Sequence, residues 1–136
     1  MKWLFQRFRR EASHLKTGRR GEKQAEKFLK GKGFKILGRR VCVGKHDEID
    51  LIAREGDTMV FVEVKTRKNE AYGRPAAAVS RDKRRKLSRA AVGFLQKRKL
   101  KPSYIRFDVI EVIEDPFEIR HIENGFQLEG GYRVWW

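Results

Sequence analysis

Two runs of alternating apolar and polar residues, His46–Glu55 and Thr58–Arg67, are separated only by Gly56-Asp57. Alternation with a period of two is typical of β-strands, and a two-residue connection that contains Gly is typical of a hairpin. If these two residues form the loop, the register of the whole hairpin follows from it. The hairpin is the feature that most constrains the fold, because any further strands must be added to its sheet.

This register predicts two chemically different faces. One face carries only apolar pairs and is expected to be buried: Ile49 with Val64, Leu51 with Val62, and Ala53 with Val60. The other face carries one apolar pair and two charged pairs: Ile52 with Phe61, Asp50 with Glu63, and Glu48 with Lys65. The second face therefore places two acids directly opposite each other.

The Cβ atoms of directly opposite residues lie about 5 Å apart, so the negative charges of Asp50 and Glu63 would repel. A divalent cation removes this conflict, and hard oxygen ligands suit Mg²⁺ or Mn²⁺. Lys65 leaves the strand on the same side as Glu63 and is placed to position an attacking water. Metal, carboxylates and ammonium together are what phosphodiester hydrolysis requires. Two alternatives remain: a different register with both acids in solvent, and a Lys65 that merely pairs with Glu48 across the strands.

The rest of the chain predicts two helices and three more strands. The first helix, about Thr17 to Lys32, places Glu22 on the same inward face as Ala25 and Leu29, where it can act as a third carboxylate. A second helix is capped by Ser80 and runs to about Lys97. The other strands are Phe34–Val43, Tyr104–Ile113 and Phe117–Glu123. We therefore expect an α/β fold in the order α-β-β-β-α-β-β, a mixed sheet of about five strands with helices on both faces.

Length and charge limit the class of protein. The chain has 136 residues, which suits one domain. We assign residues 17–126 to that domain, residues 1–16 to a basic helix or arm, and residues 127–136 to a tail. The formal charge of +15 favours a polyanionic partner, with nucleic acid ahead of ribosomal RNA or an anionic membrane surface. A single cysteine excludes an internal disulfide framework and a multi-cysteine zinc site.

Neither a spanning segment nor a secretory leader is expected, because no apolar run approaches about 18 residues and the first ten residues are interrupted by charge. We therefore expect a cytoplasmic protein without stable membrane insertion. Residues 1–16 have helical apolar spacing, which suits either a membrane or partner surface or packing on the domain itself. Trp135 and Trp136 suit packing on the domain or on a second subunit.

Other residues that could carry chemistry are expected to have structural or surface roles. Asp108 lies in an apolar run, where we favour a structural pair with Arg106 or a helix end over a further site acid. Cys42 is expected to be a small buried side chain. The histidines have no catalytic spacing, and surface or packing roles are expected for all three: His14, His46 and His121.

Taken together, these motifs resemble the YraN family of small bacterial proteins from about Gly18 to Phe126. The matching segments are Gly18 to Ala25, Glu48 to Ala53, Val60 to Arg67, Arg74-Pro75 through Val79, Lys83, and Arg106 to Val109. The family usually has Gly where this chain has Asp47. The resemblance implies a restriction-endonuclease-like fold, similar to archaeal Holliday-junction resolvases, which are metal-dependent nucleases of the PD-(D/E)xK type.

Carried over residue by residue, the resemblance implies an active site made of Glu22, Asp50, Glu63 and Lys65. The expected function is a Mg²⁺- or Mn²⁺-dependent endodeoxyribonuclease, with a homodimer favoured only by the resolvase analogy. Basic residues would hold the DNA backbone: Arg67, Lys83, Arg84, Arg85 and Lys86, together with the Lys68–Pro75 loop. The alternative is a nucleic-acid binding protein without catalysis on the same fold.

Overall fold

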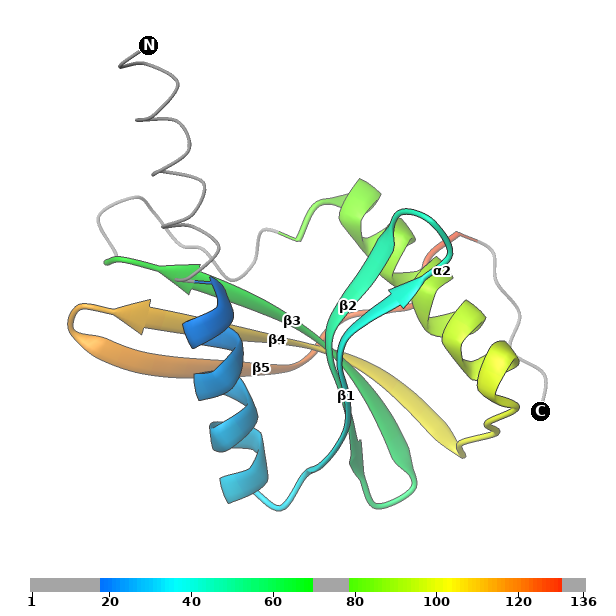
Figure 1. Cartoon of the computed structure of the whole chain (residues 1–136), viewed down its shortest axis with the longest axis horizontal. Coiled ribbons are helices and arrows are strands. Elements are labelled where there is room, and N and C mark those ends of the chain that lie inside the picture. Colours follow the sequence, from blue (N-terminus) through cyan, green and yellow to red (C-terminus); the bar gives the residue numbers. More distant parts are fainter. Residues whose placement is uncertain (1–17, 70–78, 131–136) are drawn as a thin grey trace, which may run out of the picture.

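The computed structural model describes residues 18–69 and 79–130. Five strands form one sheet and lie in it in the order of the sequence (Figure 1). They are β1 (Lys35–Val43), β2 (Asp47–Glu55), β3 (Thr58–Arg67), β4 (Tyr104–Glu114) and β5 (Phe117–Phe126). Neighbouring strands are antiparallel except β3 and β4, which are parallel and are joined by the crossover helix α2 (Arg81–Arg98). The predicted α/β class and order of elements are confirmed.

The helix before β1 is described over residues 18–31 and covers one face of the sheet. Its buried residues Ala25 and Leu29 pack against Leu51, Val62 and Ile110 in one hydrophobic cluster. The opposite face forms a second cluster with α2. Figure 1 shows the two helices on either side of the twisted sheet, so helices cover both faces, as the sequence predicts.

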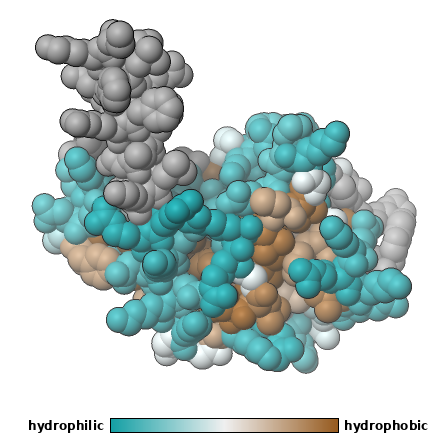
Figure 2. Space-filling model, in the orientation of Figure 1, coloured by the Kyte–Doolittle hydropathy of each residue, from teal (hydrophilic) through white to brown (hydrophobic). Residues whose placement is uncertain are grey.

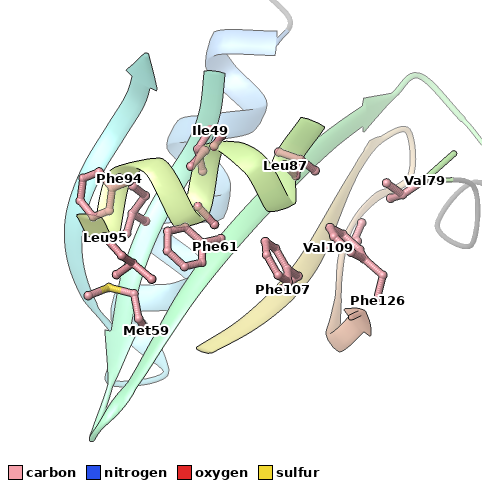
Figure 3. Close-up of a cluster of buried hydrophobic side chains, with 13 residues drawn as sticks. Ile49, Met59, Phe61, Val79, Leu87, Phe94, Leu95, Phe107, Val109 and Phe126 are labelled. Atoms are coloured by element: carbon pink, nitrogen blue, oxygen red, sulfur yellow. The ribbon is translucent and has the colours of Figure 1, made fainter. Parts of the chain in front are cut away.

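Helix α2 is positioned by its cap and its apolar stripe. The side chain of Ser80 accepts a hydrogen bond of 3.1 Å from the backbone N–H of Lys83, which satisfies a free donor of the first turn. The apolar residues that recur at helical spacing along α2 are all buried: Leu87, Ala90, Ala91, Phe94 and Leu95. Figure 3 shows Leu87, Phe94 and Leu95 facing the side chains of the sheet, Phe61 among them. Phe94 contacts Phe61 edge to face, with 6.2 Å between the ring centroids, a geometry that aromatic pairs prefer.

The hairpin β2–β3 has the predicted register, but over a shorter length. The paired residues run from Glu55 and Thr58 to Leu51 and Val62, where the pairing ends. Beyond this point β2 stays paired with β1 as far as Asp47, and β3 stays paired with β4 as far as Arg67. The two strands therefore separate, and we call this point the fork.

The predicted pairs beyond the fork, Asp50 with Glu63, Ile49 with Val64 and Glu48 with Lys65, are therefore wrong as ladder pairs. Ile49 packs on the α2 side, whereas Leu51 packs on the side of the first helix. The cause is a break in alternation. Neither Arg40 nor Asp50 belongs to the β1–β2 pairs, and Arg40 has a φ of 46°. This kink turns the ends of β1 and β2 toward α2.

Side-chain exposure corrects one further prediction. Cys42 is exposed, not buried, because its neighbours Val41 and Val43 pack against the α2 cluster and alternation turns Cys42 outward. His46 is exposed and His121 is largely buried, as a surface role and a packing role require. Figure 2 shows hydrophilic side chains over most of the visible surface and an apolar area right of centre.

The described residues contain no helix long and apolar enough to cross a membrane. The expectations for residues 1–16, for Trp135 and Trp136, and for most of the Lys68–Pro75 loop lie outside the described residues.

Candidate active site

Asp50 and Glu63 are the first residues beyond the fork, one on each strand. The Oδ2 atom of Asp50 accepts a hydrogen bond of 2.8 Å from the backbone N–H of Val64, which ties its side chain to β3 across the gap. The Glu63 side chain is 11% exposed, and its Oε2 atom is buried without a hydrogen-bond partner among the described residues. Although they form no ladder pair, the two predicted acids are brought together.

The electrostatics of this pair are unfavourable without a cation. Burial, and then the charge of Glu63, raises the pKa of Asp50 to about 7. Burial also raises the pKa of Glu63, although Lys83 and Lys65 partly oppose this. Two carboxyl groups that share a poorly hydrated site cannot easily both ionise. A positive charge placed between them would relieve both effects.

Two lysines border the pair from different elements. The Nζ atom of Lys83, in the first turn of α2, lies 3.7 Å from Oε1 of Glu63. Lys65 lies two residues beyond Glu63 on the same side of β3, and burial lowers its pKa despite the opposing charge of Glu63. The sequence placed Lys83 among residues that hold DNA; the structure places it beside the carboxylates.

Glu22 lies near the pair but is turned to another partner. Its Oε2 atom accepts a hydrogen bond of 2.6 Å from Nε of Arg40, although its charge still contributes to the raised pKa of Asp50. Within residues 18–69 and 79–130, no group of three or more His, Cys, Asp or Glu side chains could hold a metal ion. Asp50 and Glu63 do fit Mg²⁺ or Mn²⁺, since Glu63 offers an unpartnered oxygen and Mg²⁺ commonly needs only one or two carboxylates.

Glu111 is an acid near this site that the sequence reasoning missed. It lies beside Lys65 in the parallel β3–β4 register and is fully buried. Its Oε1 atom lies 3.3 Å from Nη1 of Arg120, and its Oε2 atom has no hydrogen-bond partner among the described residues. The available signal was a charged residue inside the apolar run from Val109 to Ile113.

Asp108 has the structural role that we favoured. Arg106 binds its carboxylate through two hydrogen bonds of 2.8 and 2.9 Å. His121 lies 2.7 Å away and the backbone N–H of Asn124 donates at 2.9 Å. Burial alone would raise the pKa of Asp108, but these hydrogen bonds outweigh burial and lower it.

The predicted DNA-binding residues differ in their surroundings. Arg84 is engaged within the protein, by Glu129 at 2.7 Å and by the carbonyl oxygen of Val79 at 2.9 Å. Arg85 is exposed. Arg67 is half-buried near Lys65, and Lys86 pairs with Asp82 on the preceding turn of α2. Of the predicted phosphate contacts on α2, the one from Arg85 would come from an exposed side chain, whereas Arg84 would first have to leave its partners in the protein.

Asp47 stands where the family that the motifs resemble usually has Gly. It links β2 to α2 through a salt bridge with Arg89. Arg89 donates two hydrogen bonds of 2.7 and 2.8 Å to its carboxylate. The hydrogen bond from Arg89 lowers the pKa of Asp47. The charge of Asp47 is thus compensated by α2 at the start of the strand that carries Asp50.

The sequence profile of the family described as "Uncharacterised protein family UPF0102" matches residues 21–112, which include all four candidate site residues. The chain belongs to this family. UPF0102 is the YraN family that the motifs resemble. A UPF0102 protein of Geotalea daltonii is 47% identical over 82% of this chain and 89% of its own length. A UPF0102 protein of Syntrophus aciditrophicus is 40% identical over 90% of this chain and 97% of its own length.

Proposed function

We propose that this UPF0102 protein is a metal-dependent nuclease that hydrolyses phosphodiester bonds in DNA, with branched or recombination intermediates as the candidate substrates. The observation that carries the proposal is the carboxylate pair at the fork. Asp50 and Glu63 are largely buried, burial raises the pKa of both, the charge of Glu63 raises that of Asp50 further, and one oxygen of Glu63 has no hydrogen-bond partner among the described residues. Perturbed acids of this kind are typical of functional sites, and a bound cation would offset the cost of burying them ionised.

Each residue has a defined task in this proposal. Asp50 and Glu63 would hold Mg²⁺ or Mn²⁺, and Glu22, which stays paired with Arg40 beside them, would support them through its negative charge. A divalent cation supplies, when bound, Lewis-acid stabilisation of the charge on the phosphate oxygens and activation of water for attack. Lys65 has a lowered pKa, so it is suited to position water and to give up a proton. Lys83 orients Glu63 through its ion pair.

One observation favours the competing function, a DNA-binding protein without catalysis. Glu22 is held by Arg40, so the described residues contain no three-carboxylate cluster. In that case Asp50 and Glu63 would have only a structural role. Binding would then need no divalent cation, would weaken steeply with salt, and would produce no cuts.

The test is a cleavage assay on branched, nicked and linear DNA with Mg²⁺ or Mn²⁺. Asp50→Asn and Glu63→Gln are expected to reduce cleavage by a factor of about 10³ or more, because each removes a metal-binding charge. The matched controls are Asp57→Asn and Glu55→Gln, at exposed acids at the far end of the same hairpin. Cleavage that is equal in the site variants and the controls would overturn the proposal.

A further inference from the structure

A cavity of about 410 Å³ lies between the first helix and β1. Four cationic side chains line it, Arg19 and Lys23 from the helix and Arg39 and Arg40 from the strand. Leu51 lines it as well and, as a buried residue, supplies an apolar part of the wall. The volume falls within the range of about 300 to 1,000 Å³ that is typical of ligand pockets.

The backbone of β1 is distorted in a way that serves this cavity. Consecutive strand residues normally point to opposite faces, yet Arg39 and Arg40 both line the cavity. The positive φ of Arg40, 46°, makes this possible. Residues other than Gly rarely adopt such a φ, and strain of this kind gathers at functional sites.

Both arginines are held in place by the first helix. Arg39 pairs with Glu26 and Arg40 pairs with Glu22, one helical turn apart. Both glutamates also line the cavity, and the four cations exceed these two carboxylates by two charges. The carboxylates thus fix the guanidinium groups, and the remaining positive charge suits an anionic ligand.

The residues that line the cavity suit both the base and the phosphate of a nucleotide. Guanidinium planes stack on bases and donate hydrogen bonds to phosphate, and Leu51 gives the base an apolar contact. The bases of a duplex are stacked and paired, so only an unpaired or extruded nucleotide can enter a pocket of this kind. The cavity is also next to the fork, since Leu51 follows Asp50 in β2.

We propose that this cavity holds one unpaired nucleotide of a DNA strand, beside the phosphodiester bond placed at Asp50 and Glu63. The position of that bond rests on the proposed function; the binding of the nucleotide does not require cleavage. The substrate class is therefore DNA with a gap, flap or branch that leaves a nucleotide unpaired near the cut.

The experiment measures fluorescence anisotropy in EDTA with two DNAs of equal length, one fully paired and one with a short single-stranded gap. Wild type is expected to bind the gapped DNA more tightly. Arg39→Ala is expected to weaken binding to gapped DNA about tenfold more than binding to duplex, as expected for a lost stacking contact. Arg39→Lys keeps the charge but loses the planar group, and is expected to show most of the same selective loss.

The matched control is Arg54→Ala, which removes one exposed cation at the far end of β2 and should weaken both DNAs alike. The Arg39 side chain is 59% exposed, so its variants are expected to fold. Equal losses for the two DNAs, or an Arg39→Lys variant that binds as wild type does, would mean that the cavity contributes only charge and would overturn the inference. Selective binding without cleavage in Mg²⁺ would instead overturn the nuclease proposal, while the cavity would still be assigned to an unpaired nucleotide.

Discussion

Asp50 lies where its own charge is unfavourable. It is largely removed from solvent and close to a second carboxylate, so its pKa rises to about 7. The hydrogen bond from the backbone of Val64 fixes the side chain at the fork and stabilises its ionised form only in part. The protein therefore loses folding free energy at neutral pH to keep this group in place, which is typical of functional sites.

The first prediction concerns the pH dependence of stability without divalent cations. An acid whose pKa is raised in the folded state binds more protons folded than unfolded, so stability falls as pH rises from about 4 to about 7. The free energy of unfolding is expected to fall by about 2 kcal/mol between pH 5 and pH 8 in EDTA. Asp50→Asn should flatten this profile in urea denaturation, and Asp57→Asn should not. A wild-type profile that rises over this range would contradict the assignment.

The second prediction concerns Asp108, whose carboxylate neutralises Arg106 inside the protein. Asp108→Ala leaves Arg106, at 18% exposure, without this partner and is expected to lower the free energy of unfolding by about 3 kcal/mol. Asp82→Ala, at an exposed position on α2, should change it by less than about 1 kcal/mol. An Asp108→Asn variant with wild-type stability and no cleavage would instead make Asp108 a member of the active site.

The position of a single residue could be predicted from the sequence where a local pattern determined it. The hairpin register identified Asp50 and Glu63, because both lie on the strands next to a well-defined turn. Cys42 was misjudged, since its burial depended on whether Cys42 or its two apolar neighbours, Val41 and Val43, faced α2. Glu111 was missed because the apolar run around it does not by itself show that β4 is an inner strand of the sheet, which is what buries Glu111.

The fork between β2 and β3 is the element that creates the site. Each strand keeps one partner beyond Leu51 and Val62, so neither leaves the sheet, but the two move apart from each other. At this opening Asp50 and Glu63 lie close together without forming a ladder pair, and Asp50 accepts a hydrogen bond from the backbone of Val64 on the opposite strand. A continuous ladder would have filled that space with regular cross-strand pairs.

The third prediction concerns the contact between the first helix and β3. A Cβ atom added to Gly21 would lie 1.9 Å from Oγ1 of Thr66, whereas one added to Gly18 would meet nothing within 4 Å. Gly21→Ala is expected to push the helix from the sheet and to lower the free energy of unfolding by about 1 to 3 kcal/mol. Gly18→Ala, the matched control, should be neutral or slightly stabilising because Ala favours helix.

The same contact positions Glu22, the next residue of the helix. Cleavage is therefore expected to fall in Gly21→Ala even where the protein is folded. Adding Thr66→Ala removes the clashing oxygen and should restore both stability and cleavage, which a double-mutant cycle measures. Additive effects of the two substitutions would show that the contact does not couple these elements.

The fourth prediction separates two neighbouring arginines of α2. Arg85 is exposed, whereas Arg84 is bound to Glu129 and Val79. Each phosphate contact contributes about −0.9 to the slope of log affinity against log salt. Arg85→Ala should reduce the magnitude of the slope for duplex DNA by about one, and Arg84→Ala should mainly reduce thermal stability. The reverse result would mean that Arg84 leaves Glu129 to bind DNA.

The boundaries of the elements followed from local signals to within a few residues. The cap at Ser80 and the turn at Gly56-Asp57 are chemical signals, and both were found where expected. The end of β5 was placed too early, at Glu123. The strand instead passes through Asn124-Gly125 with a φ of 52° at Asn124 and a shift of register, and ends at Phe126.

For the whole molecule, the sequence predicted a mixed sheet between two helices, because a helix between two strands implies a parallel crossover. It did not predict the fork, since the separation of β2 and β3 depends on how β1 and β4 pair with these two strands and how α2 packs against them. The cavity beside the first helix was equally hidden, because it depends on one unusual φ value at Arg40. Both features arise from packing between distant segments.

The nuclease account depends on one property of the molecule, that the acids at the fork form a binding site for a divalent cation. The direct measurement is the titration of Mn²⁺ into the protein at pH 7.5, followed by electron paramagnetic resonance of the free ion. One saturable site per chain is expected, weakened at least tenfold by Asp50→Asn or Glu63→Gln and unchanged by Asp57→Asn. Wild-type protein that binds no Mn²⁺, or binds it equally well without either acid, would contradict the account.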